Sequence, residues 1–108
     1  MPLPIYFTQG AERDLYAIYD YVADHDSPKK ADDLLDKFQK LIAGLSDSAE
    51  RGAIPKELLN LGIREYRQLY FKPYRIIYRC VEKKVMIYMV ADGRRDMQTL
   101  LERRLLSQ

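Results

Sequence analysis

Tyrosine and arginine are the residue types in this sequence whose number and spacing could support chemistry or binding. The chain holds nine tyrosines, and five in its second half are interleaved with arginines. These residues are Tyr66, Tyr70, Tyr74, Tyr78 and Tyr88, with Arg64, Arg67, Arg75 and Arg79 among them. A surface of aromatic rings and guanidinium groups suits stacking on nucleic-acid bases or a protein-binding hot spot. Tyrosine is also an ordinary strand former whose hydroxyl group reaches water, so both interpretations stay open at this point.

The net charge of +2 is divided unevenly along the chain. Residues 1–63 carry seven basic and eleven acidic side chains, a net charge of −4, whereas residues 64–108 carry eleven basic and five acidic ones, a net charge of +6. This division points to an anionic partner for the C-terminal half. A solvated strand face would give the same charge count, so charge alone does not decide between the two.

Groups that bind metals or cofactors are not visible in the sequence. Cys80 and His25 are the single cysteine and the single histidine, and neither has neighbours at metal-ligand spacing. Cys80 stands in an apolar stretch, which predicts a core position, whereas His25 lies between two aspartates and is predicted to be a solvated loop residue. No glycine-rich phosphate-binding motif is present. We therefore expect no metal and no cofactor.

Clustered carboxylates around residue 33 are a further candidate for chemistry. Their lysine neighbours make an exposed helix face with salt bridges the better interpretation. The residues concerned are Asp32, Asp33 and Asp36, with Lys29, Lys37 and Lys40 nearby.

A strand and two helices are predicted in the first half of the chain. Residues 3–7 are short, apolar and β-favouring, which indicates a first strand. Thr8 can cap a helix whose apolar residues recur at three- and four-residue spacing over residues 11–22. Ser27, followed by proline, starts a second helix with an apolar stripe over residues 28–45. Because the connection is only a few residues long, the two helices should form an antiparallel hairpin.

From residue 63 onward the apolar period changes to two, which predicts strands. The last of these strands is apolar on both faces, so we place it in the middle of the sheet. A segment before the strands should cross and cover the sheet edge, and a short helix capped by Asp96 should end the fold. The segments are residues 54–62 (crossing), 66–71, 74–81 and 85–90 (strands), 91–96 (loop) and 97–105 (helix).

The fold class that follows is α+β, in a single domain over residues 1–108. The helix hairpin must bury its apolar stripe against the sheet, which gives two layers: an N-terminal strand and an antiparallel helix hairpin packed on a small antiparallel sheet, with a short C-terminal helix. No apolar run approaches the roughly 20 residues that a membrane span needs, and no signal peptide is visible. We therefore expect a cytoplasmic protein that does not contact membranes.

An ordered set of motifs resembles the RelE/ParE superfamily of toxins from bacterial type II toxin–antitoxin systems. The most specific block is Lys72-Pro73-Tyr74-Arg75-Ile76-Ile77-Tyr78-Arg79. The others are Ala11, Asp14, Leu15, Ile18, Tyr21 and Val22 in the first helix; Ser27, Pro28 and Ala31 at the start of the second; Gly62-Ile63-Arg64-Glu65-Tyr66-Arg67; and Asp92-Gly93-Arg94-Arg95-Asp96 followed by Leu100 and Leu101. Together they cover almost the whole chain in the family's order.

The resemblance implies a toxin that arrests growth and a cognate antitoxin with a small, acidic C-terminal region. The apolar groove between helices and sheet should accept an amphipathic segment, and the basic half should attract an acidic one. Two branches of the superfamily share the scaffold. RelE-like toxins cleave mRNA in the ribosomal A site, whereas ParE-like toxins inhibit DNA gyrase and are not thought to be nucleases.

The residues at the nuclease positions favour the ParE-like branch. By resemblance, Arg75 matches the strand arginine and Arg95 the loop arginine that hold the scissile phosphate in RelE-like toxins. The lysine positions hold Tyr66 and Gln68, and the C-terminal tyrosine position holds Leu101. RNA cleavage needs a base and an acid, and an unperturbed phenol with a pKa near 10 is a poor base at neutral pH.

The sequence therefore predicts a gyrase inhibitor that is more plausibly not an enzyme, with a ribosome-dependent endoribonuclease as the alternative. If the protein is a nuclease, its catalytic residues are Arg75, Arg95 and Tyr66. The candidates for target or antitoxin binding are Arg67, Tyr70, Arg75, Arg94, Arg95, Arg103 and Arg104.

Overall fold

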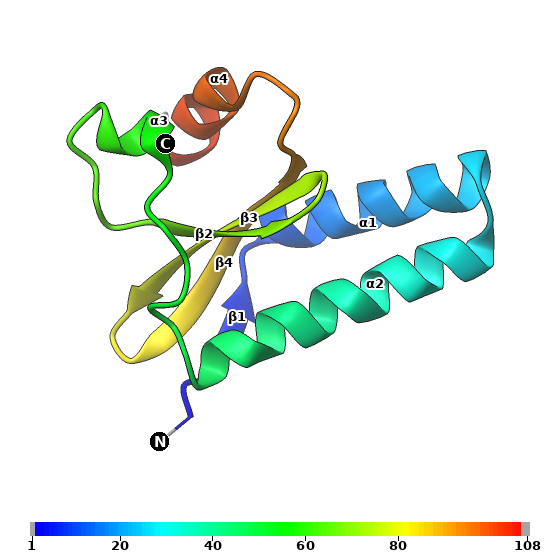
Figure 1. The fold of residues 1–108 in the computed structure, drawn as a ribbon, viewed down its shortest axis with the longest axis horizontal. Coiled ribbons are helices and arrows are strands. Elements are labelled where there is room, and N and C mark those ends of the chain that lie inside the picture. The colour runs from blue at the N-terminus through cyan, green and yellow to red at the C-terminus, as the bar shows by residue number, and fades with distance from the viewer. Residues whose placement is uncertain (1, 107–108) are drawn as a thin grey trace.

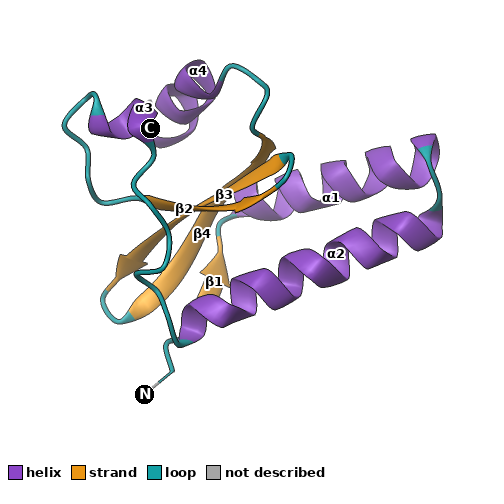
Figure 2. Cartoon of the chain, in the orientation of Figure 1, coloured by secondary structure: helices purple, strands orange, loops and turns teal. Residues whose placement is uncertain are grey.

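A computed structural model describes residues 2–106 and shows a helix hairpin on one face of a four-stranded sheet (Figure 1). The strand order across the sheet is β1-β4-β3-β2. Short helices lie beyond the opposite face (Figure 2). The elements are β1 (Ile5–Phe7), α1 (Gln9–His25), α2 (Pro28–Ala43), α3 (Lys56–Leu59), β2 (Arg67–Phe71), β3 (Tyr74–Val81), β4 (Lys84–Asp92) and α4 (Met97–Leu101), followed by a π-helical turn (Glu102–Leu106).

Side-chain caps start both helices of the hairpin as the sequence predicts. The Thr8 hydroxyl accepts a hydrogen bond from the Ala11 amide at 3.1 Å, and the Ser27 hydroxyl accepts one from the Lys30 amide at 3.1 Å. Helix α1 runs on to His25, whose ring stacks on that of Tyr21 with centroids 4.0 Å apart. Within residues 2–106, no helix combines the length and apolar character required to cross a membrane.

The larger core lies between the hairpin and the sheet. Phe38 and Ile42 of α2 pack with Ile76 and Tyr78 of β3, and all four are at most 3% exposed. The buried Tyr78 hydroxyl donates to the Ala49 carbonyl at 2.7 Å and accepts from the Gly52 amide at 2.9 Å. Since both hydrogen-bonding roles of the hydroxyl are satisfied, the phenol can be buried without a large desolvation cost.

A β-bulge in β4 creates a second core on the other face. Ile77 pairs with Met89, but the next residue of β3 pairs with Ile87, so Tyr88 is the extra residue in β4. The bulge reverses the side-chain alternation. Val85 and Ile87 face the hairpin, whereas Met89 and Ala91 face α3 and α4.

The structure confirms the α+β class, the order of the elements and the antiparallel meander of β2, β3 and β4. It differs in one pairing, because β1 runs parallel to β4 and the sheet is therefore mixed. The long connection between β1 and β4 allows the chain to return in the same direction. The crossing segment (residues 54–62) also holds α3, and Ala53, the residue just before it, bridges to Gln68 at the β2 edge.

The predicted core position of Cys80 is wrong, because this cysteine is exposed. Pairing between β2 and β3 stops at Arg67 and Tyr78. Beyond Tyr78, strand β3 therefore has a neighbour only on its β4 side, and Cys80 pairs with Val85 at an open edge of the sheet. The apolar pattern of β3 could not show that its pairing with β2 stops at Tyr78.

The β3–β4 turn offers a test of the backbone. Glu82 and Lys83 have φ angles of 51° and 62°, a left-handed region that costs side-chain-bearing residues free energy. The double substitution Glu82→Asn/Lys83→Gly should raise the free energy of unfolding by about 1 kcal/mol and Tm by about 4 °C. Thermal melts followed by circular dichroism measure this. Glu82→Ala/Lys83→Ala removes the same side chains but keeps both Cβ atoms, so it should give no such gain; a lower Tm for the Asn-Gly variant would contradict the turn geometry.

Candidate functional site

The loop between β4 and α4 presents two of the predicted arginines to solvent. The Asp92 carboxylate accepts hydrogen bonds from the Arg94 backbone amide (2.9 Å) and from its guanidinium (2.6 and 3.0 Å). These contacts, with the nearby positive charge of Arg95, lower the pKa of Asp92 to about 2. Asp96 then caps α4 by accepting from the Thr99 amide and hydroxyl. The carboxylates at either end of the loop thus hold its shape while Arg94 and Arg95 project outward.

Three arginines form what we call the exposed basic set: Arg94, Arg95 and Arg103. The Arg94 side chain is 78% exposed although it pairs with Asp92. Arg95 and Arg103 are exposed and form no ion pair within the described part of the chain. Arg94 and Arg95 also border a hollow of about 400 Å³ that Tyr21 and Tyr74 line. Their guanidinium groups are therefore available to an anionic or hydrogen-bond-accepting partner.

Arg75 has a structural partner instead. Its side chain is 5% exposed, and it donates two hydrogen bonds of 2.8 Å to the Glu57 carboxylate of α3 and one of 2.6 Å to the Gln68 amide oxygen of β2. The hydrogen bonds from Arg75 lower the pKa of Glu57. A Cβ atom on Gly93 would come within 2.8 Å of the Arg75 side chain, so the loop glycine packs directly on it. Arg75 thus ties α3 and the loop to the sheet.

Two more of the predicted arginines also join segments of the fold. Arg67 donates to the carbonyls of Gly52 (2.8 Å) and Glu50 (3.3 Å). Arg104 donates two hydrogen bonds of 2.9 Å to Asp14 of α1, whose carboxylate also accepts from the Val90 amide. These contacts fasten the segment beside β2 and the C-terminal turn.

The tyrosines that the sequence singled out differ in their surroundings. Tyr66 is 8% exposed, meets Tyr88 edge to face at a centroid distance of 5.3 Å, and lies 5.7 Å from the Arg79 guanidinium carbon. Burial raises the pKa of Tyr66, so still less of its side chain is in the basic phenolate form at neutral pH. Tyr70 is 59% exposed on the edge strand β2.

Of the three residues predicted for a nuclease, only Arg95 lines the hollow beside the β4–α4 loop. Arg75 and Tyr66 are buried on the face that α3 and α4 cover, and the hollow beside Arg95 is lined by neither of them. Within residues 2–106, no group of three or more His, Cys, Asp or Glu side chains is placed to hold a metal ion.

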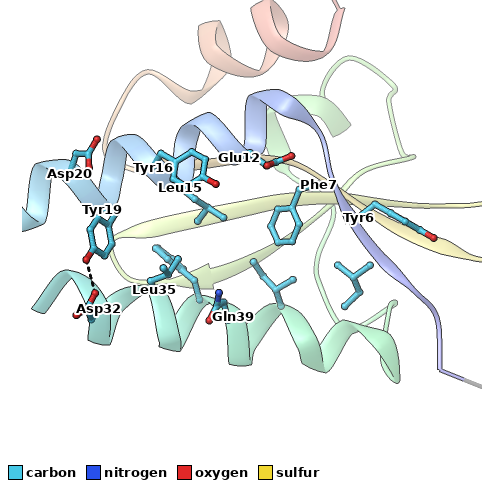
Figure 3. A pocket seen from close by; sticks show the side chains of 13 residues that line it. Tyr6, Phe7, Glu12, Leu15, Tyr16, Tyr19, Asp20, Asp32, Leu35 and Gln39 are labelled. Carbon is cyan, nitrogen blue, oxygen red and sulfur yellow. Dashed lines mark hydrogen bonds between the residues drawn. The ribbon is translucent and has the colours of Figure 1, made fainter. Parts of the chain in front are cut away.

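A groove of about 920 Å³ lies between α1 and α2 and ends at β1 (Figure 3). Apolar side chains that include Phe7, Leu15 and Leu35 line it. Near the hairpin tip the Tyr19 hydroxyl donates to the Asp32 carboxylate at 2.5 Å and links the two helices. This hydrogen bond raises the pKa of Tyr19. The sequence predicted an apolar groove between the helices and the sheet, whereas this groove lies between the two helices themselves.

The comparisons with known proteins agree with this fold. The family described as "ParE toxin of type II toxin-antitoxin system, parDE" matches residues 5–97. A chromosomal ParDE toxin–antitoxin structure from P. aeruginosa superimposes with a TM-score of 0.70 and 23% identity, covering 83% of this chain and 95% of that one. A RelBE2 toxin–antitoxin complex from Mycobacterium tuberculosis gives a TM-score of 0.61 and 22% identity, covering 85% and 99%. No curated protein matches the chain significantly.

These findings define the class of protein as a RelE/ParE-type toxin fold. More particularly, the chain belongs to the family of ParE toxins of type II toxin–antitoxin systems.

The Arg75–Glu57 pair predicts a pH-dependent stability. Glu57→Gln should lower the free energy of unfolding by about 3 kcal/mol at pH 7, because the Arg75 guanidinium then stays buried without its counter-charge. The pKa of Glu57 in the folded protein lies below its ordinary value of 4.5. The contribution of the pair is therefore complete above pH 4.5 and is lost as the pH falls through the folded-state pKa.

Urea unfolding of the wild type and E57Q at a series of pH values measures this difference. The gap between the two should be widest near pH 7 and narrow below pH 4.5. The exposed Glu50→Gln variant is the matched control and should change stability by less than about 0.5 kcal/mol. A gap that is the same at every pH would contradict the role assigned to the pair.

Proposed function

We propose that this protein is a ParE-like toxin that inhibits DNA gyrase and arrests growth until its antitoxin neutralises it. The observation that carries the proposal is which arginines are exposed and which are bound within the fold. The exposed arginines are Arg94, Arg95 and Arg103. Arg75, which matches the strand arginine of RelE-like nucleases, is instead bound to Glu57. Gyrase inhibition requires a binding surface and no acid or base. The proposed place of action is the cytoplasm, where gyrase works.

The nuclease alternative has weaker support at each chemical step. Cleavage of RNA needs a base for the 2′-hydroxyl and cations on the phosphate. Tyr66 is buried with a raised pKa, and the Arg75 guanidinium donates to Glu57 and Gln68 within the fold. Membership of the ParE toxin family also favours the gyrase target.

We also propose that a cognate antitoxin is the second partner. Two of the structures that share the fold are described as a ParDE system and a RelBE2 toxin–antitoxin complex. The groove between α1 and α2 offers an apolar surface long enough for a helical segment, and the exposed basic set offers cations to an acidic one. The toxin therefore has separate surfaces for two kinds of contact.

A supercoiling assay with purified gyrase tests the proposed target. Wild-type protein should block supercoiling, and the variant Arg94→Ala/Arg95→Ala/Arg103→Ala should need at least about tenfold more protein for the same inhibition, because it removes the exposed cations. The control Lys29→Ala/Lys37→Ala/Lys40→Ala removes equal charge from exposed positions of α2 and should stay within about twofold of wild type. Full supercoiling at an excess of wild-type protein would refute the gyrase proposal.

The substitution Tyr66→Phe distinguishes gyrase inhibition from mRNA cleavage in cells. This substitution keeps the aromatic ring and its packing against Tyr88 but removes the hydroxyl group. If the protein acts on gyrase, induced Y66F should arrest growth as strongly as wild type, and primer extension should show no cuts in ribosome-bound mRNA. Loss of arrest in Y66F, together with A-site cuts by wild type, would replace this proposal with the nuclease function.

A further inference from the structure

The charged residues that line the α1–α2 groove all carry the same sign. Apolar side chains form most of its lining, and the ionisable carboxylates that border it are Glu12, Asp20 and Asp32. Among residues 2–106, no lysine or arginine belongs to the lining of the groove. The surface is therefore apolar along its length and negative at its margins, although the toxin as a whole carries a net charge of +2.

The lysines of α2 form their ion pairs away from this groove, and Lys84 lies over the ring of Tyr6 at the β1 end of it, with 5.9 Å between its Nζ atom and the ring centroid. The ion pairs of α2 lie on its exposed side: Lys29 pairs with Asp33, and Lys40 with Asp36. Within residues 2–106, neither Glu12 nor Asp20 forms an ion pair. Asp32 accepts a hydrogen bond from the neutral Tyr19 phenol, and the charges of Asp32 and Asp20 both help to raise the pKa of that phenol.

The spacing of the carboxylates suits a docked helix. Glu12 and Asp20 are eight residues apart on α1, which at 1.5 Å per residue separates them by about 12 Å along the helix axis. The lining of α2 runs from Asp32 to Ile42, a span of about 15 Å on the same geometry. A helix of about three turns fits this length, with side chains seven or eight positions apart reaching Glu12 and Asp20.

We propose that the groove binds an amphipathic helix of the antitoxin that carries lysine or arginine beside its apolar face, about two turns apart, opposite Glu12 and Asp20. This proposal rests on the toxin–antitoxin function proposed above and adds the charge of the bound segment. It separates the antitoxin into two parts. A basic helical part occupies the groove, whereas any acidic part contacts the exposed basic set at the other end of the chain.

The carboxylates provide selectivity more than affinity. Each exposed pair between a groove carboxylate and a lysine contributes only a fraction of a kilocalorie per mole, and the apolar contacts supply most of the binding. An acidic helix in the same groove would meet like charges at several points, which disfavours it. The groove thus distinguishes a cognate antitoxin from an acidic segment of equal hydrophobicity.

Synthetic peptides test this directly with the full-length toxin. Three 16-residue helical peptides share one leucine face and differ only at two flanking positions, eight residues apart, which hold lysine, glutamine or glutamate. Fluorescence anisotropy in low salt should rank binding as lysine above glutamine above glutamate, with about tenfold between the extremes. In Glu12→Gln/Asp20→Asn, and in 0.5 M NaCl, this ratio should fall to about threefold or less.

The variant Asp33→Asn/Asp36→Asn is the matched control, because it removes the same charge from α2 outside the groove, and it should keep the ratio within about twofold of wild type. Equal binding of the lysine and glutamate peptides, a preference for glutamate, or no binding of any peptide would overturn the proposal. A stable toxin dimer that Glu12→Gln/Asp20→Asn dissociates in sedimentation velocity would also overturn it, by showing a second copy in the groove. The supercoiling assay contains no antitoxin segment and the peptide assay contains no gyrase, so failure of the gyrase proposal and failure of the charge proposal are distinguishable.

Discussion

Strand β4 is apolar on both of its faces, and the packing of the other elements follows from the need to cover both. The bulge at Tyr88 turns Val85 and Ile87 toward the helix hairpin and Met89 and Ala91 toward α3 and α4. A sheet of four strands with only one covered face would leave the second set of side chains in water. The C-terminal segment must therefore fold back over the sheet, and this return places the loop of Arg94 and Arg95 at the end of β4.

The return of the chain also divides the arginines predicted to bind a partner into two groups with different roles. Arg67, Arg75 and Arg104 each bind to another segment of the fold, and the Arg75–Glu57 pair fixes α3 in its place with two parallel hydrogen bonds. Arg94, Arg95 and Arg103 remain at the surface. Part of the positive charge of the second half is thus paired within the fold. Only the exposed arginines remain to contact a partner.

Local patterns predicted the elements well, because caps and apolar periodicity act within a few residues. Thr8, Ser27 and Asp96 all cap the helices that follow them, and β4 lies inside the sheet as its two apolar faces indicate. The features that the sequence did not reveal depend on partners distant in the sequence. Cys80 is exposed because β2 begins only at Arg67, Arg75 is buried because α3 supplies Glu57, and Asp32 borders the groove because α1 lies opposite. Separations of 18 residues between Arg75 and Glu57, and of 13 between Asp32 and Tyr19, leave no periodic signal.

The central claim is that the groove is needed for neutralisation but not for toxicity, whereas the exposed basic set is needed for toxicity and is only a secondary contact for the antitoxin. Growth of cells that express toxin variants, with and without the antitoxin encoded by the adjacent reading frame, tests this claim most directly. The account predicts that Glu12→Gln/Asp20→Asn still arrests growth but is poorly neutralised, whereas Arg94→Ala/Arg95→Ala/Arg103→Ala no longer arrests growth yet still copurifies with the antitoxin. If either variant, folded as wild type, loses both toxicity and antitoxin binding, the two surfaces are one and the account is wrong.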